Sequence, residues 1–453
     1  MGKDEIFKFE NAPELVGTAG LRLIPNSRLK PDAKNAVVWP HLGVKGKTKL
    51  SLGIDPRPIL PPPTGIDELD DRTGRTNVKF QVPKVWSQGR LQSWLNCPRK
   101  AWYNNQHGLG RDEKMSEDVA AATRGNIVHM IEERILLSHG LVEGEIPESP
   151  IPLDSGPLAI PDYALTTVLH GLEDLAPWLG RKDGVSFFRS QTLIGASPAL
   201  WSNWVEHKFP FKLGGKIGGL LDADMQANGV APIASEWNLG GSNFSHVSLT
   251  LPEKPSTVLK LRGRIDRVDS VLINSDLVKN DITEEIPLDI SIGDRPPTSR
   301  LVIIRDLKSV DGGDKEGKNK HKKSLFEQLQ LALYARSWEI EHPGDRVIGV
   351  GVTSVGSTTT HWVEIDPEYS EELAKLNVGE LTGLTHEHYR LPDSGIDCES
   401  NPFRAWMRER LTTALRVIKA VENGNIHPEP SHLCNYCPII DACPTGLEEL
   451  SGI

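Results

Sequence analysis

The sequence predicts an α/β fold in which helices flank a central mixed sheet. Helical and strand-like hydrophobic patterns alternate along the chain, and the predicted core order is helix, strand, strand, helix, strand. The 453 residues could hold about three domains of average size, although one elaborated domain with insertions is equally allowed. No internal repeat is found, so a repeat architecture is not indicated.

Two helices are predicted before the strands. In 87–109 and in 117–140, apolar residues recur at steps of three and four, as expected for an amphipathic helix. Gly140 is a suitable stop for the second helix, because glycine readily adopts the left-handed conformation that ends helices. Cys97 falls inside the first helix or at its end, and His129 falls inside the second.

Two strands follow, at 257–273 and 300–310. The first alternates apolar and charged residues, and the second begins with an apolar run that is typical of a buried strand. The remaining predicted elements are a helix at 324–341, strands at 346–355 and 360–366, and a helix at 402–424.

The segments outside this core look different. Residues 1–83 contain the run "DPRPILPPPTG" and predict an extended, partly disordered arm, since proline removes backbone donors and fixes φ. We expect one folded domain over 84–446, with an insertion at about 141–255 and a short tail at 447–453. No apolar stretch of about 18 residues and no secretory leader pattern are found, so a cytoplasmic protein without a membrane span is expected.

The five cysteines are too sparse for a disulfide framework. Cys434, Cys437 and Cys443 have the spacing C-x2-C-x5-C, which is one ligand short of a structural metal site. Zinc and a 4Fe-4S cluster both take four ligands, so the spacing alone does not separate the two. The remaining cysteines are Cys97 and Cys398.

A second group of residues is suited to cutting phosphodiesters. Asp266 and Asp306 lie on strands that could be neighbours, and Lys308 lies two residues after Asp306, on the same side of its strand. Converging carboxylates can bind Mg²⁺ or Mn²⁺, which activates water and neutralises phosphate charge, and the ammonium can stabilise a developing oxyanion. Any one of these residues alone would more often be a surface charge.

The order of these residues resembles the PD-(D/E)XK nuclease superfamily in its RecB-like branch. The matching motifs are "GNIVH" ending at His129, "GRID" ending at Asp266, "DLK" from Asp306 to Lys308, and "QLALY" from Gln330 to Tyr334. The similarity covers roughly residues 87–446 apart from insertions, and it implies a restriction-endonuclease-like core.

The resemblance also implies roles for individual residues. His129, Asp266, Asp306 and the carbonyl of Leu307 would bind the metal, and Lys308 would serve catalysis. Gln330 and Tyr334 would support the site or the DNA. Taken alone, His129 would more often be a satisfied polar residue on a helix, and Tyr334 would more often be part of the core.

The same resemblance suggests where the fourth cysteine ligand is. Iron-sulfur members of this branch, which include AddB-type helicase-nuclease subunits and CRISPR-associated nucleases, place one cysteine before the nuclease core and three after it. By this analogy Cys97 completes a structural 4Fe-4S cluster with Cys434, Cys437 and Cys443, and the cluster joins the two ends of the domain. Zinc remains the alternative, and Cys398 is left as a free thiol.

The formal net charge of −10 means that DNA binding must rely on local basic groups. A lysine-rich segment next to the predicted site is one candidate, although such runs are often only solvated loops. Its lysines are Lys315, Lys318, Lys320, Lys322 and Lys323.

Together these features predict a Mg²⁺- or Mn²⁺-dependent deoxyribonuclease that acts on single strands or DNA ends in repair. No phosphate-binding P-loop motif is found, so any helicase motor would be a separate subunit. The alternatives are a CRISPR-type adaptation nuclease and a catalytically silent iron-sulfur scaffold that binds DNA.

Overall fold

The structure is a computed structural model of the chain. The residues that it describes are 69–70, 75–76, 82–107, 121–155, 214–241, 245–251, 256–273, 298–309, 328–356, 358–381, 402–426, 428–429, 431, 434 and 437–439. The chain divides into two compact units. The first includes Gly89–Lys114 and Arg416–Ile453, and the second is formed by Val85–Gln88 and Met115–Leu415.

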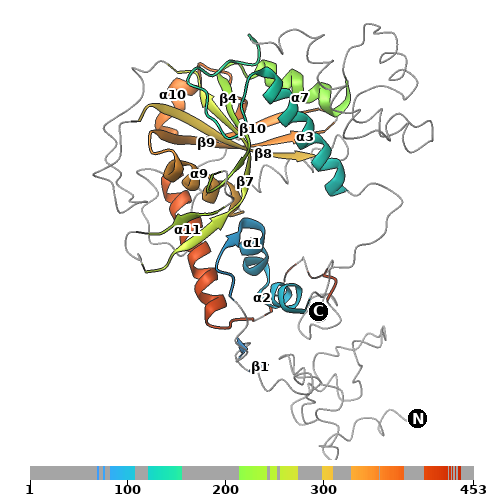
Figure 1. The fold of residues 1–453 in the computed structure, drawn as a ribbon, viewed down its shortest axis with the longest axis vertical. Coiled ribbons are helices and arrows are strands. Elements are labelled where there is room, and N and C mark those ends of the chain that lie inside the picture. Colours follow the sequence, from blue (N-terminus) through green and yellow to red (C-terminus); the bar gives the residue numbers. More distant parts are fainter. Residues whose placement is uncertain are drawn as a thin grey trace, which may run out of the picture. The chain divides into compact units, whose positions relative to one another are not determined.

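A mixed sheet forms the centre of the second unit (Figure 1). Among the described residues it has six strands in the order β11-β10-β9-β8-β7-β4. Strand β7 is antiparallel to both neighbours, whereas β8 and β9 are parallel. The strands are β4 (Val230–Asn238), β7 (Arg264–Val271), β8 (Arg300–Ser309), β9 (Asp345–Val355), β10 (Thr360–Ile365) and β11 (Glu380–Leu381).

A smaller sheet in the same unit has the order β3-β6-β5. Its strands are β3 (Trp86–Ser87), β5 (Val247–Leu249) and β6 (Leu259–Arg262). Only Gly263 separates β6 from β7, so one extended segment passes from the small sheet into the large one. The carbonyl of Gly263 accepts a hydrogen bond from the N–H of Leu239, which keeps this junction tied to the chain after β4.

Helices cover both faces of the large sheet. Arg267 on β7 contacts both α3 (Ala121–His139) and α7 (Gly215–Gln226), so these two helices lie on its face of the sheet. Arg305 is the cross-strand partner of Arg267 and shares that face, whereas the adjacent Asp306 contacts α9 (Gln330–Glu341) on the other. The structure also has a 3-10 turn (Pro367–Tyr369), α10 (Ser370–Leu373) and α11 (Pro402–Glu422).

Buried ion pairs attach the helices to both faces. On the α3 and α7 face, Arg267 lies 2.6 Å from Asp224, 3.2 Å from Glu132 and 2.7 Å from Asp269, and Asp269 also pairs with Arg305. Every member of this group is buried. Buried charges are costly unless they are paired, so this network permits few alternative positions for α3 and α7.

On the opposite face, the carboxylate of Glu339 in α9 receives the guanidinium of Arg404 at 2.7 Å and that of Arg336 at 3.0 Å. The indole N–H of Trp338 donates to Asp345 at the start of β9. These contacts fasten the beginning of α11 and the sheet to α9, which carries two of the predicted site residues.

Most of the predicted elements are confirmed. Strands β8, β9 and β10 and helix α11 begin and end within two residues of their predicted bounds. Helix α3 is followed by Gly140 with φ +123°, as its predicted stop requires. No described helix is both long and apolar enough to cross a membrane.

Two predicted elements are split. The first predicted helix is broken into α1 (Gln88–Asn96) and α2 (Pro98–Trp102), because Cys97 precedes a proline and is extended, with φ −163° and ψ 105°. A short π-helix at Tyr103–His107 follows. The predicted strand at 257–273 is divided at Gly263, where the chain changes sheets.

Three other segments differ from the prediction. Helix α9 begins at Gln330, later than the predicted 324, with the preceding described residues in a bend. Part of the expected insertion, 214–251, supplies α7, β4 and β5, and β4 belongs to the central sheet. A short pair, β1 (Leu69–Asp70) and β2 (Arg75–Thr76), lies in the segment predicted as an extended arm.

Candidate metal and catalytic site

The site begins where strands β7 and β8 separate. Their ladder runs from Ser270 opposite Val302 to Arg267 opposite Arg305 and is not continued at Asp266. At this point the Asp266 side chain replaces a backbone acceptor: its Oδ2 accepts a hydrogen bond from the backbone N–H of Leu307 at 2.7 Å. A carboxylate is thereby fixed in the fork between two strands, with its second oxygen available for other partners.

Asp306, Lys308 and Gln330 meet beside this fork. The Lys308 ammonium lies 3.0 Å from Oδ1 and 2.8 Å from Oδ2 of Asp306, and the Gln330 amide donates to Oδ1 at 2.7 Å. The Asp306 side chain is 5% exposed, whereas that of Lys308 is 35% exposed. The carboxylate is therefore held from two sides, and the ammonium lies at the edge of the site.

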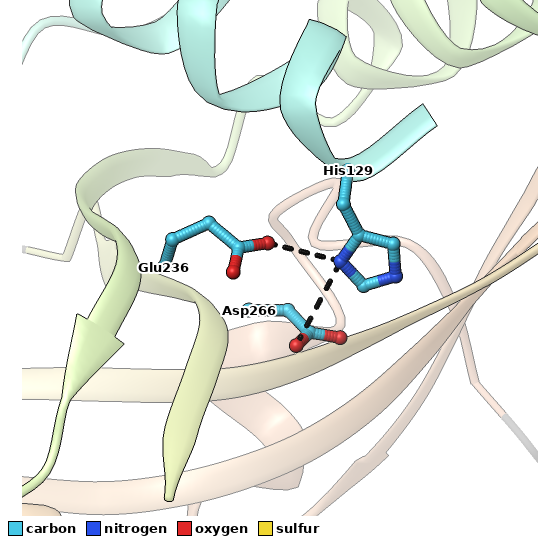
Figure 2. Close-up of side chains that lie close together, drawn as sticks. All are labelled: His129, Glu236 and Asp266. Carbon is cyan, nitrogen blue, oxygen red and sulfur yellow. Dashed lines mark hydrogen bonds and ion pairs between the residues drawn. The ribbon is translucent and has the colours of Figure 1, made fainter. Parts of the chain in front are cut away.

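His129 reaches the fork from α3 (Figure 2). Its Nδ1 lies 2.9 Å from Oε1 of Glu236 and 3.9 Å from Oδ1 of Asp266, and its Nε2 lies 3.1 Å from the carbonyl oxygen of Leu307. A carbonyl and a carboxylate both accept hydrogen bonds, so each ring nitrogen faces an acceptor. In the metal-free protein this arrangement favours the doubly protonated imidazolium.

Glu236 is the site residue that the sequence analysis missed. It lies on β4 with φ +48°, a left-handed conformation that costs a non-glycine residue about 1–3 kcal/mol. Its neighbours Ser235 and Trp237 keep their pairing with β7, and the strained residue between them turns its carboxylate toward His129. The only sequence signal was one acidic residue in the otherwise uncharged strand "VAPIASEWN".

The electrostatics of the site change the pKa of its members. Burial and the Asp306 charge raise the pKa of Asp266 to about 8. Burial lowers the pKa of His129, but the hydrogen bond to Glu236 and the charges of Asp266 and Glu236 outweigh it and raise the pKa to about 9. The site therefore retains protons, because burial disfavours the charged form of Asp266 and because the neighbouring carboxylates favour protonation of Asp266 and His129.

These residues fit a divalent cation. The ligand atoms of His129, Glu236 and Asp266 lie within 4.8 Å of one another, and the Leu307 carbonyl lies beside the imidazole. Carboxylate and carbonyl oxygens are the ligands that Mg²⁺ and Mn²⁺ prefer, and imidazole is a ligand for several other first-row transition metals. The protons that the site retains are those that a bound cation would displace.

Tyr334 packs against the junction between the two sheets. A Cβ on Gly263 would lie 2.7 Å from the Tyr334 hydroxyl, so the close approach of the ring requires glycine there. The hydroxyl bonds to the backbone of Arg264, and burial with the charges of Asp266 and Asp306 raises the pKa of Tyr334 above its ordinary value. Tyr334 is therefore a neutral, buried phenol that supports the strand leading into Asp266.

The other predicted sites are described only in part. Cys97, Cys434 and Cys437 are half-buried and belong to the first unit. Cys443 and Cys398 lie outside the described residues. The predicted DNA-binding lysines also lie outside them; these are Lys315, Lys318, Lys320, Lys322 and Lys323.

The raised pKa values predict that metal-free protein loses stability as the pH rises from about 7 to 9. Burial raises the pKa of Glu132 to about 7, so this group, Asp266 and His129 all hold protons more tightly when folded than when unfolded. Stability from such groups is fully present below the unfolded pKa and is lost as the pH rises through the folded pKa, so the free energy of unfolding should fall over this range. Urea denaturation in EDTA should show this loss.

Added Mg²⁺ should stabilise the protein more at pH 9 than at pH 7, because the cation competes with protons for the same atoms. Asp266→Asn is the control and should reduce both effects. Metal-free stability that is flat or rising over this range would contradict the assignment of the protons to this site.

The comparison with known protein families agrees with the geometry. A family model described as the PD-(D/E)XK nuclease superfamily matches residues 85–278 and 294–444, which is well over half of the chain. The curated proteins contain no match to the chain. The matched ranges include every element that contributes to the fork, and the chain belongs to the PD-(D/E)XK nuclease superfamily.

Proposed function

We propose that the protein is a Mg²⁺- or Mn²⁺-dependent deoxyribonuclease. The observation that carries this proposal is the fork, where Asp266 and Asp306 converge and Lys308 extends from the same strand as Asp306. A buried and a half-buried carboxylate with an accessible ammonium are suited to phosphodiester hydrolysis, in which negative charge builds up on the phosphate oxygens.

The groups that would hold the cation are His129, Glu236 and Asp266, with the Leu307 carbonyl beside them, and the motif resemblance adds Asp306. When bound, the cation supplies Lewis acidity toward the phosphate and lowers the pKa of water. The hydrogen bond from the Leu307 N–H and that from Gln330 fix the two aspartates in place, which reduces the reorganisation needed during reaction.

Lys308 acts as a fixed positive charge in this proposal. Burial lowers the pKa of Lys308, but the Asp306 charge and hydrogen bond outweigh it and raise the pKa above its ordinary value. The ammonium therefore stays protonated at neutral pH, which makes it unsuitable as a general base and suitable for stabilising an oxyanion.

The finer function follows from the motif resemblance. Similarity to the RecB-like branch supports action on single strands or DNA ends, in repair or recombination, with a separate helicase subunit as the motor. A cytoplasmic location is part of the same proposal.

We also propose a structural 4Fe-4S cluster held by Cys97, Cys434, Cys437 and Cys443. Cys97 and the first two C-terminal cysteines belong to one unit, in which the Arg99 side chain donates to the Ile426 carbonyl at 3.0 Å. The N–H of Ser431 points at Sγ of Cys434, 3.4 Å away, and N–H bonds to cysteine sulfur are a usual feature of cluster ligands. The shared unit of these cysteines and the donor at Cys434 fit a thiolate-bound cluster.

Substituting site residues should abolish cleavage. Asp306→Ala removes the partner of both Lys308 and Gln330, and Lys308→Ala removes the fixed charge, so each should lower kcat at least 100-fold. The measurement is cleavage of end-labelled single- and double-stranded DNA with Mg²⁺ or Mn²⁺, using anaerobically purified protein. Lys375→Ala, an exposed lysine on the loop after α10, is the matched control and should cleave normally.

Unchanged cleavage in Asp306→Ala would overturn the enzymatic proposal. A wild-type protein that carries its metals and cleaves neither form of DNA would favour a DNA-binding scaffold.

The cluster proposal predicts different outcomes for two cysteines. Cys97→Ser should lose iron and acid-labile sulfide together and unfold at lower urea concentration, because it removes a ligand that ties both ends of the first unit. Cys398→Ser should keep the full metal content. Wild-type protein purified without oxygen that contains zinc and no sulfide would contradict the cluster.

A further inference from the structure

Strand β6 and the start of β7 carry an exposed row of basic side chains. Burial alternates along this segment: Leu259, Leu261 and Ile265 are fully buried and Gly263 is half-buried, whereas the residues that alternate with them are exposed. The exposed members are Lys260, Arg262 and Arg264. The next position in the same alternation is Asp266, so the row ends at the proposed metal site.

The cross-strand neighbours of the row are hydroxyl residues. Ser248 on β5 is paired with Lys260, and Ser87 on β3 is paired with Arg262. Directly paired residues project on the same side of a sheet, so this face of the small sheet presents basic groups flanked by hydroxyls. Within the described part of the chain, neither Lys260 nor Arg262 has a carboxylate partner, although the protein is acidic overall.

Arg264 joins the row to the site. Its Nε lies 2.5 Å from Oε2 of Glu236, while its side chain remains 58% exposed. One edge of the guanidinium is thus held by a residue of the site, and the rest is accessible to a ligand. This contrasts with Arg267 and Arg305, which are buried in ion pairs.

The spacing of the row matches a linear polyanion. Alternate residues of a strand are about 6.6 Å apart, which is comparable to the distance between successive phosphates of an extended nucleic-acid strand. Arginine, lysine and hydroxyl groups are the usual partners of phosphate oxygens. A row of basic side chains at this spacing, in which only Arg264 has a carboxylate partner among the described residues, has the chemistry to hold a phosphodiester backbone.

We propose that Lys260, Arg262 and Arg264 form a phosphate-binding row that holds one polynucleotide strand and leads it to Asp266. This inference rests on the proposed nuclease function and deepens it, because it assigns the substrate path to the β3-β6-β5 face. Backbone recognition of this kind does not distinguish bases, and DNA and RNA strands share the phosphates that it reads.

The test compares Lys260→Gln/Arg262→Gln with wild type in binding labelled oligothymidylate and oligouridylate, with Ca²⁺ in place of Mg²⁺ to suppress cleavage. The dissociation constant is measured between about 50 and 200 mM salt. Losing two contacts should weaken binding roughly tenfold and reduce the slope of log affinity against log salt by about 1.4, since each single-strand phosphate contact contributes about 0.7.

Two further variants make the test specific. Lys375→Gln/Lys419→Gln removes the same charge from exposed positions elsewhere and should leave the slope unchanged. Lys260→Arg/Arg262→Lys keeps both charges and should also keep the slope. An effect on both polymers would support backbone recognition.

The inference would be overturned if Lys260→Gln/Arg262→Gln had the same slope of log affinity against log salt as wild type. It would also be overturned if wild-type protein bound neither polymer. Hydrolysis of bis(4-nitrophenyl) phosphate by wild type with Mn²⁺ reports separately on the metal site. If binding depends on the row but the protein hydrolyses neither that diester nor DNA, the nuclease proposal is wrong and the phosphate-binding row is still supported.

Discussion

The hydrogen bond from the Leu307 N–H to the Asp266 carboxylate is the interaction on which the site depends. Two paired strands normally satisfy each other's backbone groups, but here β7 and β8 separate and a side chain satisfies the exposed donor. This side-chain hydrogen bond brings the Asp266 carboxylate close to the Leu307 carbonyl and to the part of β8 that carries Asp306. Without it, the fork would leave an unpaired N–H and no fixed position for a cation.

Buried ion pairs fix the strands and helices around this fork. Next to it, Arg267 and Arg305 both form ion pairs with Asp269 across the two strands. Arg267 also forms ion pairs with Glu132 in α3 and Asp224 in α7. Arg267, which directly follows Asp266, is thus a buried cation. Leu307, which directly follows Asp306, is the hydrogen-bond donor of the fork. Because α3 is anchored through Glu132, one turn from His129, the same ion network that secures the helix also aims the imidazole.

Site residues could be predicted from the sequence where their spacing along one strand or one helix places them on the same face. Asp306 and Lys308 share a strand face, and Gln330 and Tyr334 share a helix face, so their convergence followed from spacing and family motifs. Glu236 and the junction at Gly263 were not predictable in this way. A left-handed glutamate and a strand that changes sheets are set by tertiary packing, here by His129, Arg264 and Tyr334, and no local pattern records them.

The fork should hold a divalent cation, and diffraction from crystals grown with Mn²⁺ would show whether it does. Anomalous scattering locates manganese without reference to activity. We expect a peak bounded by His129, Asp266 and the Leu307 carbonyl, and loss of that peak in Asp266→Asn crystals under the same conditions. Saturating Mn²⁺ with no peak at the fork, or a peak that persists in Asp266→Asn, would contradict this expectation.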